Sequence, residues 1–155
     1  MDLPVRKNIR LNHYDYTKKG AYFITICVKG KNCILGDIVG GDAHIAPEVQ
    51  LSECGHIVEK YMHSIPGIDR YVIMPNHIHM IVKIDSGLMQ ESAPTQKLSV
   101  PGIVRSLKIL VTKEYGVSVW QRSYYEHIIR DEQDYLIKCR YIEQNPVNWA
   151  KDEYN

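Results

Sequence analysis

The sequence predicts an α+β fold, in which helices pack on one face of a ferredoxin-like antiparallel sheet and a further helix follows at the C-terminus. Two observations predict this class. Runs of β-branched and aromatic residues alternate along the chain with segments whose apolar residues recur at helical spacing. The chain also lacks the strand–helix repeat with a Gly-rich turn that is typical of a doubly wound parallel fold. With 155 residues and 45% apolar content, residues 1–155 fit a single domain.

The first strand is expected at residues 21–28, which read Ala-Tyr-Phe-Ile-Thr-Ile-Cys-Val. Side chains of these types favour the pleated surface of a sheet. A turn at residues 30–32 leads into residues 33–36, which we expect to pair with the first strand as a hairpin. Residues 40–42 follow as a loop.

A helix and a hairpin are expected in the middle of the chain. Ser52 is a suitable N-cap, and apolar residues recur at helical spacing after it until Pro66 stops the run. Residues 69–74 and 77–84 are rich in β-branched residues and only two residues separate them. They therefore predict two strands joined by a tight turn.

The last third of the chain predicts a helix, a strand and a final helix. Residues 98–115 place apolar side chains on one face of a helix and basic ones on the other. Residues 120–129 are expected to form a strand. Asp131 is a suitable cap for a third helix running to Asn145, and Pro146 ends that helix because proline has no amide hydrogen to donate.

Overall charge does not identify the partner. The chain has 19 Lys and Arg residues against 18 Asp and Glu residues, a formal net charge of +1. Any basic surface that binds nucleic acid must therefore be local.

Cysteine usage and hydropathy indicate a soluble, cytoplasmic protein without a membrane partner. The four cysteines form neither a CxxC pair nor a zinc-finger spacing, so we expect reduced thiols. No apolar stretch is long enough to span a bilayer.

Two histidines are the first candidate functional residues. His77 and His79 are one residue apart in a predicted strand, so both side chains project from the same face, about 7 Å apart at the backbone. Two neutral imidazoles can hold one divalent ion and leave positions open for substrate, but such a site needs a third ligand. Alternatively, the pair lies on a half-buried face and is satisfied by hydrogen bonds or water.

A tyrosine and an asparagine on the third predicted helix are the second candidate pair. Tyr141 and Asn145 are four residues apart, so their side chains lie on one face of the helix. A phenol oxygen and an amide oxygen can then act at the same site. Alternatively, Tyr141 packs the helix against the sheet and Asn145 is an ordinary helix-terminal residue.

Three motifs together resemble those of a known family. They are Pro-Asn-His-Ile-His-Met at 75–80, Trp-Gln-Arg-Ser-Tyr-Tyr-Glu-His-Ile-Ile-Arg at 120–130, and Arg-Tyr-Ile-Glu-Gln-Asn-Pro-Val at 140–147. In this order they resemble the insertion-sequence 200-like single-tyrosine transposases of the HUH nuclease superfamily, in the branch of the REP-associated tyrosine transposases. The resemblance runs from about residue 13 to the C-terminus.

The resemblance implies a metal-assisted reaction on single-stranded or hairpin DNA. It assigns His77 and His79 to a Mg²⁺ or Mn²⁺ site and Tyr141 to the nucleophile, which would form a 5′-phosphotyrosine during cleavage and rejoining. Asn145 matches the polar residue that completes the metal site. That residue is glutamine in many relatives, so the shorter asparagine is a departure, and neighbouring Gln144 is an alternative ligand. Relatives act as monomers or as homodimers, and the sequence does not choose between them.

Several basic and aromatic residues are candidate DNA contacts, because cations interleaved with aromatic rings suit phosphates and unstacked bases. Beyond the basic N-terminal segment, they are Arg105, Lys108, Arg122, Tyr124, His127 and Arg130. Two other functions stay open: a catalytically silent or domesticated relative that only binds structured nucleic acid, and a small metal-binding hydrolase unrelated to DNA.

Overall fold

A computed structural model describes residues 20–42, 44–84 and 98–151. The basic N-terminal segment lies outside these residues. The central sheet has four antiparallel strands in the order β4 (Ile68–Met74), β5 (His77–Ile84), β1 (Gly20–Cys27) and β6 (Tyr125–Ile129).

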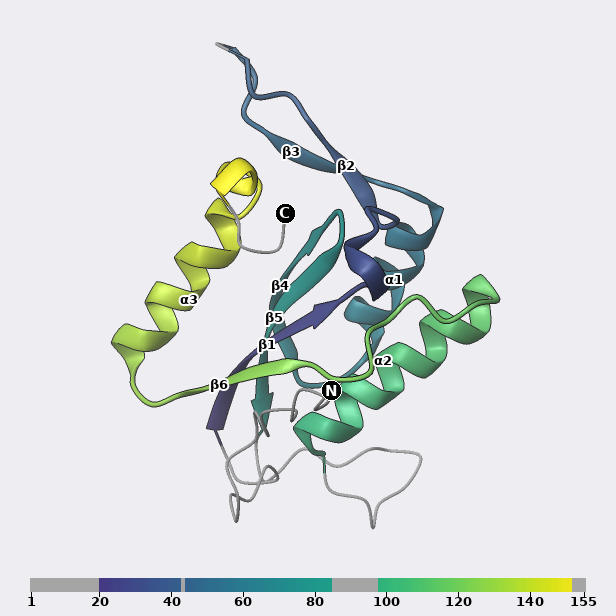
Figure 1. Ribbon diagram of the computed structural model, residues 1–155. Coiled ribbons are helices and arrows are strands. Elements are labelled where there is room, and N and C mark those ends of the chain that lie inside the picture. Colours follow the sequence, from purple (N-terminus) through teal and green to yellow (C-terminus); the bar gives the residue numbers. More distant parts are fainter. Residues whose placement is uncertain (1–19, 43, 85–97, 152–155) are drawn as a thin grey trace, which may run out of the picture.

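Three α-helices cover the two faces of this sheet. α1 (Glu53–Ser64) and α2 (Val100–Tyr115) pack on one face, and α3 (Glu132–Gln144) packs on the other (Figure 1). The order β1-α1-β4-β5-α2-β6 is the ferredoxin-like arrangement. The predicted α+β class is therefore confirmed, with the C-terminal helix alone on its own face.

Each helix begins at a capping residue. The hydroxyl of Ser52 accepts from the amide of Gly55, and the carboxylate of Asp131 accepts from the amide of Asp134. Both caps were expected from the sequence. Ser99 caps α2 in the same way. No helix within the described ranges is both long and apolar enough to cross a membrane.

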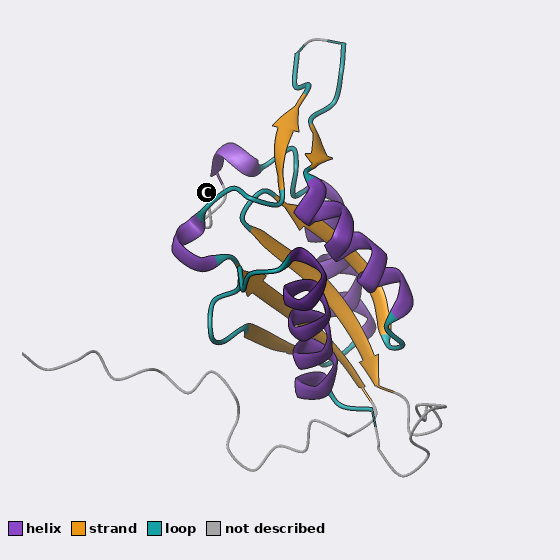
Figure 2. Ribbon diagram, turned by 90° about the vertical axis from the view of Figure 1, so that its right-hand side faces the viewer, coloured by secondary structure: helices purple, strands orange, loops and turns teal. Residues whose placement is uncertain are grey.

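The predicted pairing of residues 33–36 with the first strand is wrong. Both edges of β1 are already filled, by β5 and by β6. Gly36 instead opens β2 (Gly36–Val39), which pairs with β3 (Glu48–Leu51) in a separate two-stranded hairpin. This hairpin projects beyond the main sheet (Figures 1 and 2). A Cβ on Gly36 would lie 2.5 Å from the backbone oxygen of Gln50, so the close pairing requires glycine.

The strand predicted at 120–129 is shorter than expected. Only Tyr125–Ile129 joins the sheet, and Trp120 makes a single isolated bridge to Val28. The ammonium of Lys108 binds the carbonyl oxygens of Gln121 (2.9 Å) and Ser123 (3.3 Å). Because these carbonyls bind Lys108 of α2, they do not pair with a neighbouring strand. The hydrogen bonding of β6 to the sheet therefore begins only after them, at Tyr125.

The two faces of β1 and β5 differ in character, as side-chain alternation requires. One face carries the main core, to which α1 and α2 also contribute. Its buried residues from the two strands are Tyr22, Ile24, Ile26, Ile78, Met80, Val82 and Ile84. The opposite face carries Phe23, Thr25, His77, His79 and Ile81, and α3 covers it.

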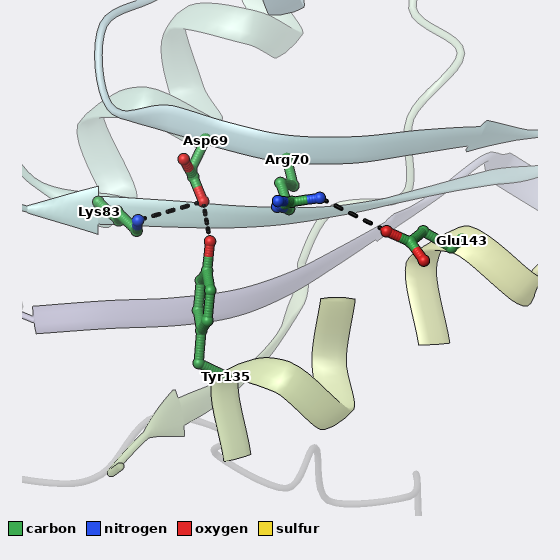
Figure 3. A network of polar contacts seen from close by, with 5 residues as sticks. All are labelled: Asp69, Arg70, Lys83, Tyr135 and Glu143. Atoms are coloured by element: carbon green, nitrogen blue, oxygen red, sulfur yellow. Dashed lines mark hydrogen bonds and ion pairs between the residues drawn. The ribbon is translucent and has the colours of Figure 1, made fainter. Parts of the chain in front are cut away.

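Two kinds of contact hold α3 on that face. Cys139 and Ile142 are buried against Phe23 and Ile81. A polar network adds to this packing (Figure 3): the hydroxyl of Tyr135 donates to Asp69 at 2.6 Å, and the remaining contacts are two ion pairs. These are Lys83–Asp69 (3.4 Å) and Arg70–Glu143 (3.5 Å). Because exposed ion pairs each contribute less than about 1 kcal/mol, the apolar contacts dominate.

Candidate active site

The two histidines of β5 converge on one point. His77 and His79 are 0% and 1% exposed, and their Nε2 atoms are 3.1 Å apart. The rings meet edge to face, with centroids 4.6 Å apart. The predicted common face of the two side chains is confirmed, and their Nε2 atoms meet in the buried interior of this face.

Neighbouring side chains orient both rings through the other nitrogen. The Nδ1 of His77 lies 2.7 Å from Oδ1 of Asn76, and the Nδ1 of His79 lies 2.7 Å from Oγ1 of Thr25. An amide oxygen only accepts, so the Nδ1 of His77 carries the proton and its Nε2 carries a lone pair. The Thr25 hydroxyl can donate or accept, so it suits either tautomer of His79.

Burial keeps both imidazoles neutral at pH 7. It lowers the pKa of His77 from the usual 6.5 to about 4, an effect that a polar contact with Asn145 partly offsets. The pKa of His79 is also lowered well below 6.5, by burial first and then by the charges of His77 and Lys138. Neutral imidazoles are the form that ligates metal ions.

These pKa shifts predict that acid destabilises the metal-free protein. The folded state holds a proton on His77 less tightly than the unfolded state, so the stability present above pH 6.5 falls as the pH drops towards 4. From about pH 7.5 to about pH 5, His77 alone accounts for a loss of about 2 kcal/mol. Urea unfolding of the unaltered protein and of His77→Gln, both in the presence of a chelator and at several pH values, measures this loss of stability. An identical pH dependence in the two proteins would contradict the shift.

Tyr141 lies directly beside this pair. Its ring meets His79 edge to face at 5.1 Å and Phe23 edge to face at 5.8 Å, while Phe23 stacks on His79 at 5.2 Å. Tyr141 is 39% exposed, so a substrate can reach it from solvent. The tyrosine contacts the histidines of its own chain.

Asn145 completes the cluster one turn later. It is 2% exposed, and its Nδ2 donates to the carbonyl oxygen of Tyr141 at 3.1 Å. Its Oδ1 is buried and has no donor in hydrogen-bonding geometry among the described residues. Gln144, the alternative that the sequence left open, points to solvent. The structure thus brings together all four residues, His77, His79, Tyr141 and Asn145.

The donor set fits a divalent ion with few protein ligands. The described residues contain no cluster of three or more His, Cys, Asp or Glu side chains that could hold a metal ion, so a third ligand from these residues would be an oxygen of another kind, such as an amide oxygen. The buried Oδ1 of Asn145 is such an atom. The Nε2 atoms of His77 and His79, 3.1 Å apart, are close enough together that both could bind one ion.

Sequence reasoning missed several residues around the pair. Thr25 and Phe23 belong to an apolar strand and carry no local motif, so only the β1–β5 register reveals them. Asn76 directly precedes His77 and was read as a turn residue. Lys138 could have been found, because it lies three residues before Tyr141 on the same helix face. Its Nζ lies 5.1 Å from the centre of the Phe23 ring.

The candidate DNA contacts separate into different places. Tyr124 is 6% exposed and belongs to the main core, a position that does not offer its ring to a base. His127 pairs with Asp134 at 2.8 Å. Arg130 is exposed at the turn before α3. Arg105 lines a cavity between the end of α1 and the start of α2, whereas Lys108 and Arg122 line another.

Comparisons with known proteins show what this chain is similar to. No protein-family model matches the sequence. An uncharacterised protein of Haemophilus influenzae is 39% identical, over 96% of this chain and 92% of its own length. A REP-associated tyrosine transposase of Escherichia coli K12 is 26% identical, over 88% of this chain and 73% of its own. The chain is thus similar in sequence to REP-associated tyrosine transposases.

A solved structure shares the fold of this protein. It is a REP-associated tyrosine transposase bound to a REP hairpin, with a TM-score of 0.59 and 24% identity over 90% of this chain and 74% of that one. The family resemblance inferred from the three motifs is therefore confirmed, as is the α+β fold.

Proposed function

We propose that this protein cleaves and rejoins single-stranded DNA beside a hairpin, through a covalent bond between Tyr141 and a 5′-phosphate. One observation carries the proposal. An exposed tyrosine packs edge to face against the buried, neutral His79, whose Nε2 converges with that of His77. The relatives support it, since one is named a transposase and a solved structure of that type holds a REP hairpin.

The reaction divides into two transfers at phosphorus. The phenol oxygen of Tyr141 attacks the scissile phosphate, the bond from phosphorus to the 3′-oxygen breaks, and that oxygen leaves as a 3′-hydroxyl after taking up a proton. A second 3′-hydroxyl then attacks the phosphotyrosine and releases the phenol. Because each step exchanges one phosphate ester for another, no ATP is needed.

His77, His79 and Asn145 would hold a Mg²⁺ or Mn²⁺ ion. When bound, this ion neutralises charge that develops on the phosphate oxygens. With only two imidazole nitrogens and one amide oxygen from the protein, such an ion would keep positions open for water and substrate. Asn76 and Thr25 hold the two rings so that both Nε2 atoms face this position.

Residues around Tyr141 position it and attract its substrate. The rings of Phe23 and His79 limit the directions in which the phenol can point. Lys138 places a cation over the outer edge of the same ring stack. This ammonium attracts the phosphate towards Tyr141. Because Tyr141 contacts His79 of its own chain, one protomer supplies a complete site, which supports action in cis.

Labelled hairpin DNA from the flanks of the protein's own gene tests the proposal. With label on the 3′ side of the cleavage point, a metal-dependent band should stay attached to protein on a denaturing gel. With label on the 5′ side, a free fragment ending in a 3′-hydroxyl should appear. A shifted but uncut hairpin would favour the catalytically silent relative. Retention of the 5′-side label would contradict the proposed polarity.

Thr25→Val tests whether the threonine supports the metal site. Valine keeps the shape but leaves the Nδ1 of His79 without its partner, so Mn²⁺ affinity should fall roughly 10–100-fold. Electron paramagnetic resonance of Mn²⁺ measures free and bound ion without reference to activity. Thr112→Val, the same change on α2, is the control. Equal Mn²⁺ affinities in the two variants would contradict the role of Thr25.

A further inference from the structure

A basic groove lies on the α2 side of the molecule and belongs to no part of the site described above. It encloses about 510 Å³ between α2, the turn after β1 and the segment before β6. Four of its lining residues are cations, namely Lys29, Lys108, Lys113 and Arg122, and none is Asp or Glu. Trp120 and Ile109 contribute apolar surface.

The positive charge of this groove is a local surplus. The whole chain has a formal net charge of +1, so four cations without a lining carboxylate cannot reflect its average composition. Within the described ranges no carboxylate pairs with Lys29, Lys113 or Arg122. A surface of this kind raises the local concentration of a polyanion.

The apolar part of the groove suits bases more than a smooth duplex. Trp120 is 3% exposed in its wall, and Ile109 is 51% exposed. The Nε1–H of Trp120 also has no acceptor among the described residues. Trp120 is buried and offers no ring face to a base, so the exposed apolar surface beside the cations is that of Ile109, which suits the unstacked bases of a single strand.

The groove and the histidine pair share one end of the sheet. Cys27, the last residue of β1, lies opposite His77, and its carbonyl accepts from the amide of Gln121 at 2.9 Å. Two residues later, the amide of Lys29 donates to the carbonyl of Val119 at 2.8 Å. The backbone that supports His77 on one face therefore continues directly into the groove on the other.

We propose that this groove binds the single-stranded DNA that extends from the cleavage point, on the opposite face of the sheet from Tyr141. This inference rests on the proposed function, because it assigns a place to a second part of the same substrate. The strand passes over the end of β1 between the two sites. Its phosphates meet Lys29, Lys113 and Arg122, and its bases meet the exposed side chain of Ile109.

The test measures binding without cleavage, in the Tyr141→Phe protein. One variant adds Lys29→Gln, Lys113→Gln and Arg122→Gln, and leaves Lys108 intact because its ammonium binds two carbonyls of the fold. A matched control adds Lys60→Gln, Lys83→Gln and Arg70→Gln, which remove the same charge outside the groove and outside the candidate DNA contacts. Fluorescence anisotropy compares a hairpin carrying a single-stranded flank with the bare hairpin, over a range of salt concentrations.

The groove variant should bind the flanked hairpin about tenfold more weakly. The slope of log affinity against log salt concentration should also be smaller in magnitude by about 2, because each lost contact to a single strand removes roughly 0.7 from that slope. The bare hairpin and the control variant should change less than about twofold in affinity. The inference is overturned if the control loses as much, if the salt dependence is unchanged, if the bare hairpin is affected equally, or if the parent protein binds neither DNA.

Failure of the groove and failure of the proposed function give different results. If the protein with an intact Tyr141 cleaves DNA while the groove variant binds normally, the groove assignment is wrong and the reaction stands. If the groove variant loses flank binding while no covalent product ever forms, the surface stands and the transposase chemistry is wrong.

Discussion

Tyr141→Phe is expected to abolish the covalent protein–DNA product and to reduce strand cleavage by a factor on the order of 10³ or more, because the nucleophilic oxygen is gone. Phenylalanine keeps the ring that packs against His79 and Phe23, so the fold and the metal site should be retained. DNA binding should stay within about twofold of the original affinity. A denaturing gel with labelled hairpin measures cleavage, and anisotropy measures binding.

Tyr135→Phe is the matched control for this substitution. It makes the same chemical change on the same helix, and it removes the 2.6 Å hydrogen bond to Asp69 that helps to hold α3 on the sheet (Figure 3). Because that contact is exposed and backed by apolar packing, we expect a loss of activity below about tenfold. If Tyr135→Phe were as inactive as Tyr141→Phe, the placement of α3 and not the phenol oxygen of Tyr141 would explain the loss.

His79→Gln is expected to have the second largest effect. It removes one of the two Nε2 atoms that face each other at 3.1 Å, and it removes the ring that packs against Tyr141. Mn²⁺ affinity should fall by at least about 100-fold, and cleavage should fall by a factor on the order of 10² or more at limiting metal. Mn²⁺ binding is followed by electron paramagnetic resonance, so that it is measured separately from the reaction.

His63→Gln provides the control for the histidine. His63 lies on α1 and hydrogen-bonds the hydroxyl of Tyr71 at 2.7 Å, on the face of the sheet remote from α3. Its replacement should leave Mn²⁺ binding and cleavage unchanged. Excess metal should restore part of the activity of His79→Gln if the histidine acts through the ion. Mn²⁺ binding by His79→Gln that equals that of the unaltered protein would contradict the proposed site.

The parts of the fold that depend on local patterns could be predicted from the sequence. The hairpin of β4 and β5 follows from two β-branched runs with a two-residue break, and the limits of α1 and α3 follow from Ser52 and Asp131. The pairing of residues 33–36 failed because sequence alone does not show that β5 and β6 occupy both edges of β1. Non-local pairing is decided by the whole core.

The candidate site divides in the same way. The HxH spacing on a strand and the four-residue spacing of Tyr141 and Asn145 predicted which side chains share a face. That these two faces meet depends on Cys139 and Ile142 packing α3 against Phe23 and Ile81. The role of Thr25 depends on its position opposite His79 across two strands, 54 residues apart in sequence. Neither the packing of α3 on the sheet nor the position of Thr25 beside His79 can be predicted from a short stretch of sequence.

Mass spectrometry of the covalent product tests the central claim most directly. Cleavage by trypsin after Arg140 and Lys151 gives the peptide 141–151, in which Tyr141 is the single tyrosine. After reaction with hairpin DNA and nuclease trimming, we predict that this peptide gains the mass of a nucleotide joined through its 5′-phosphate. A nucleotide on any other peptide, or cleavage with no modified peptide, would contradict the assignment of Tyr141 as the nucleophile beside the histidine pair.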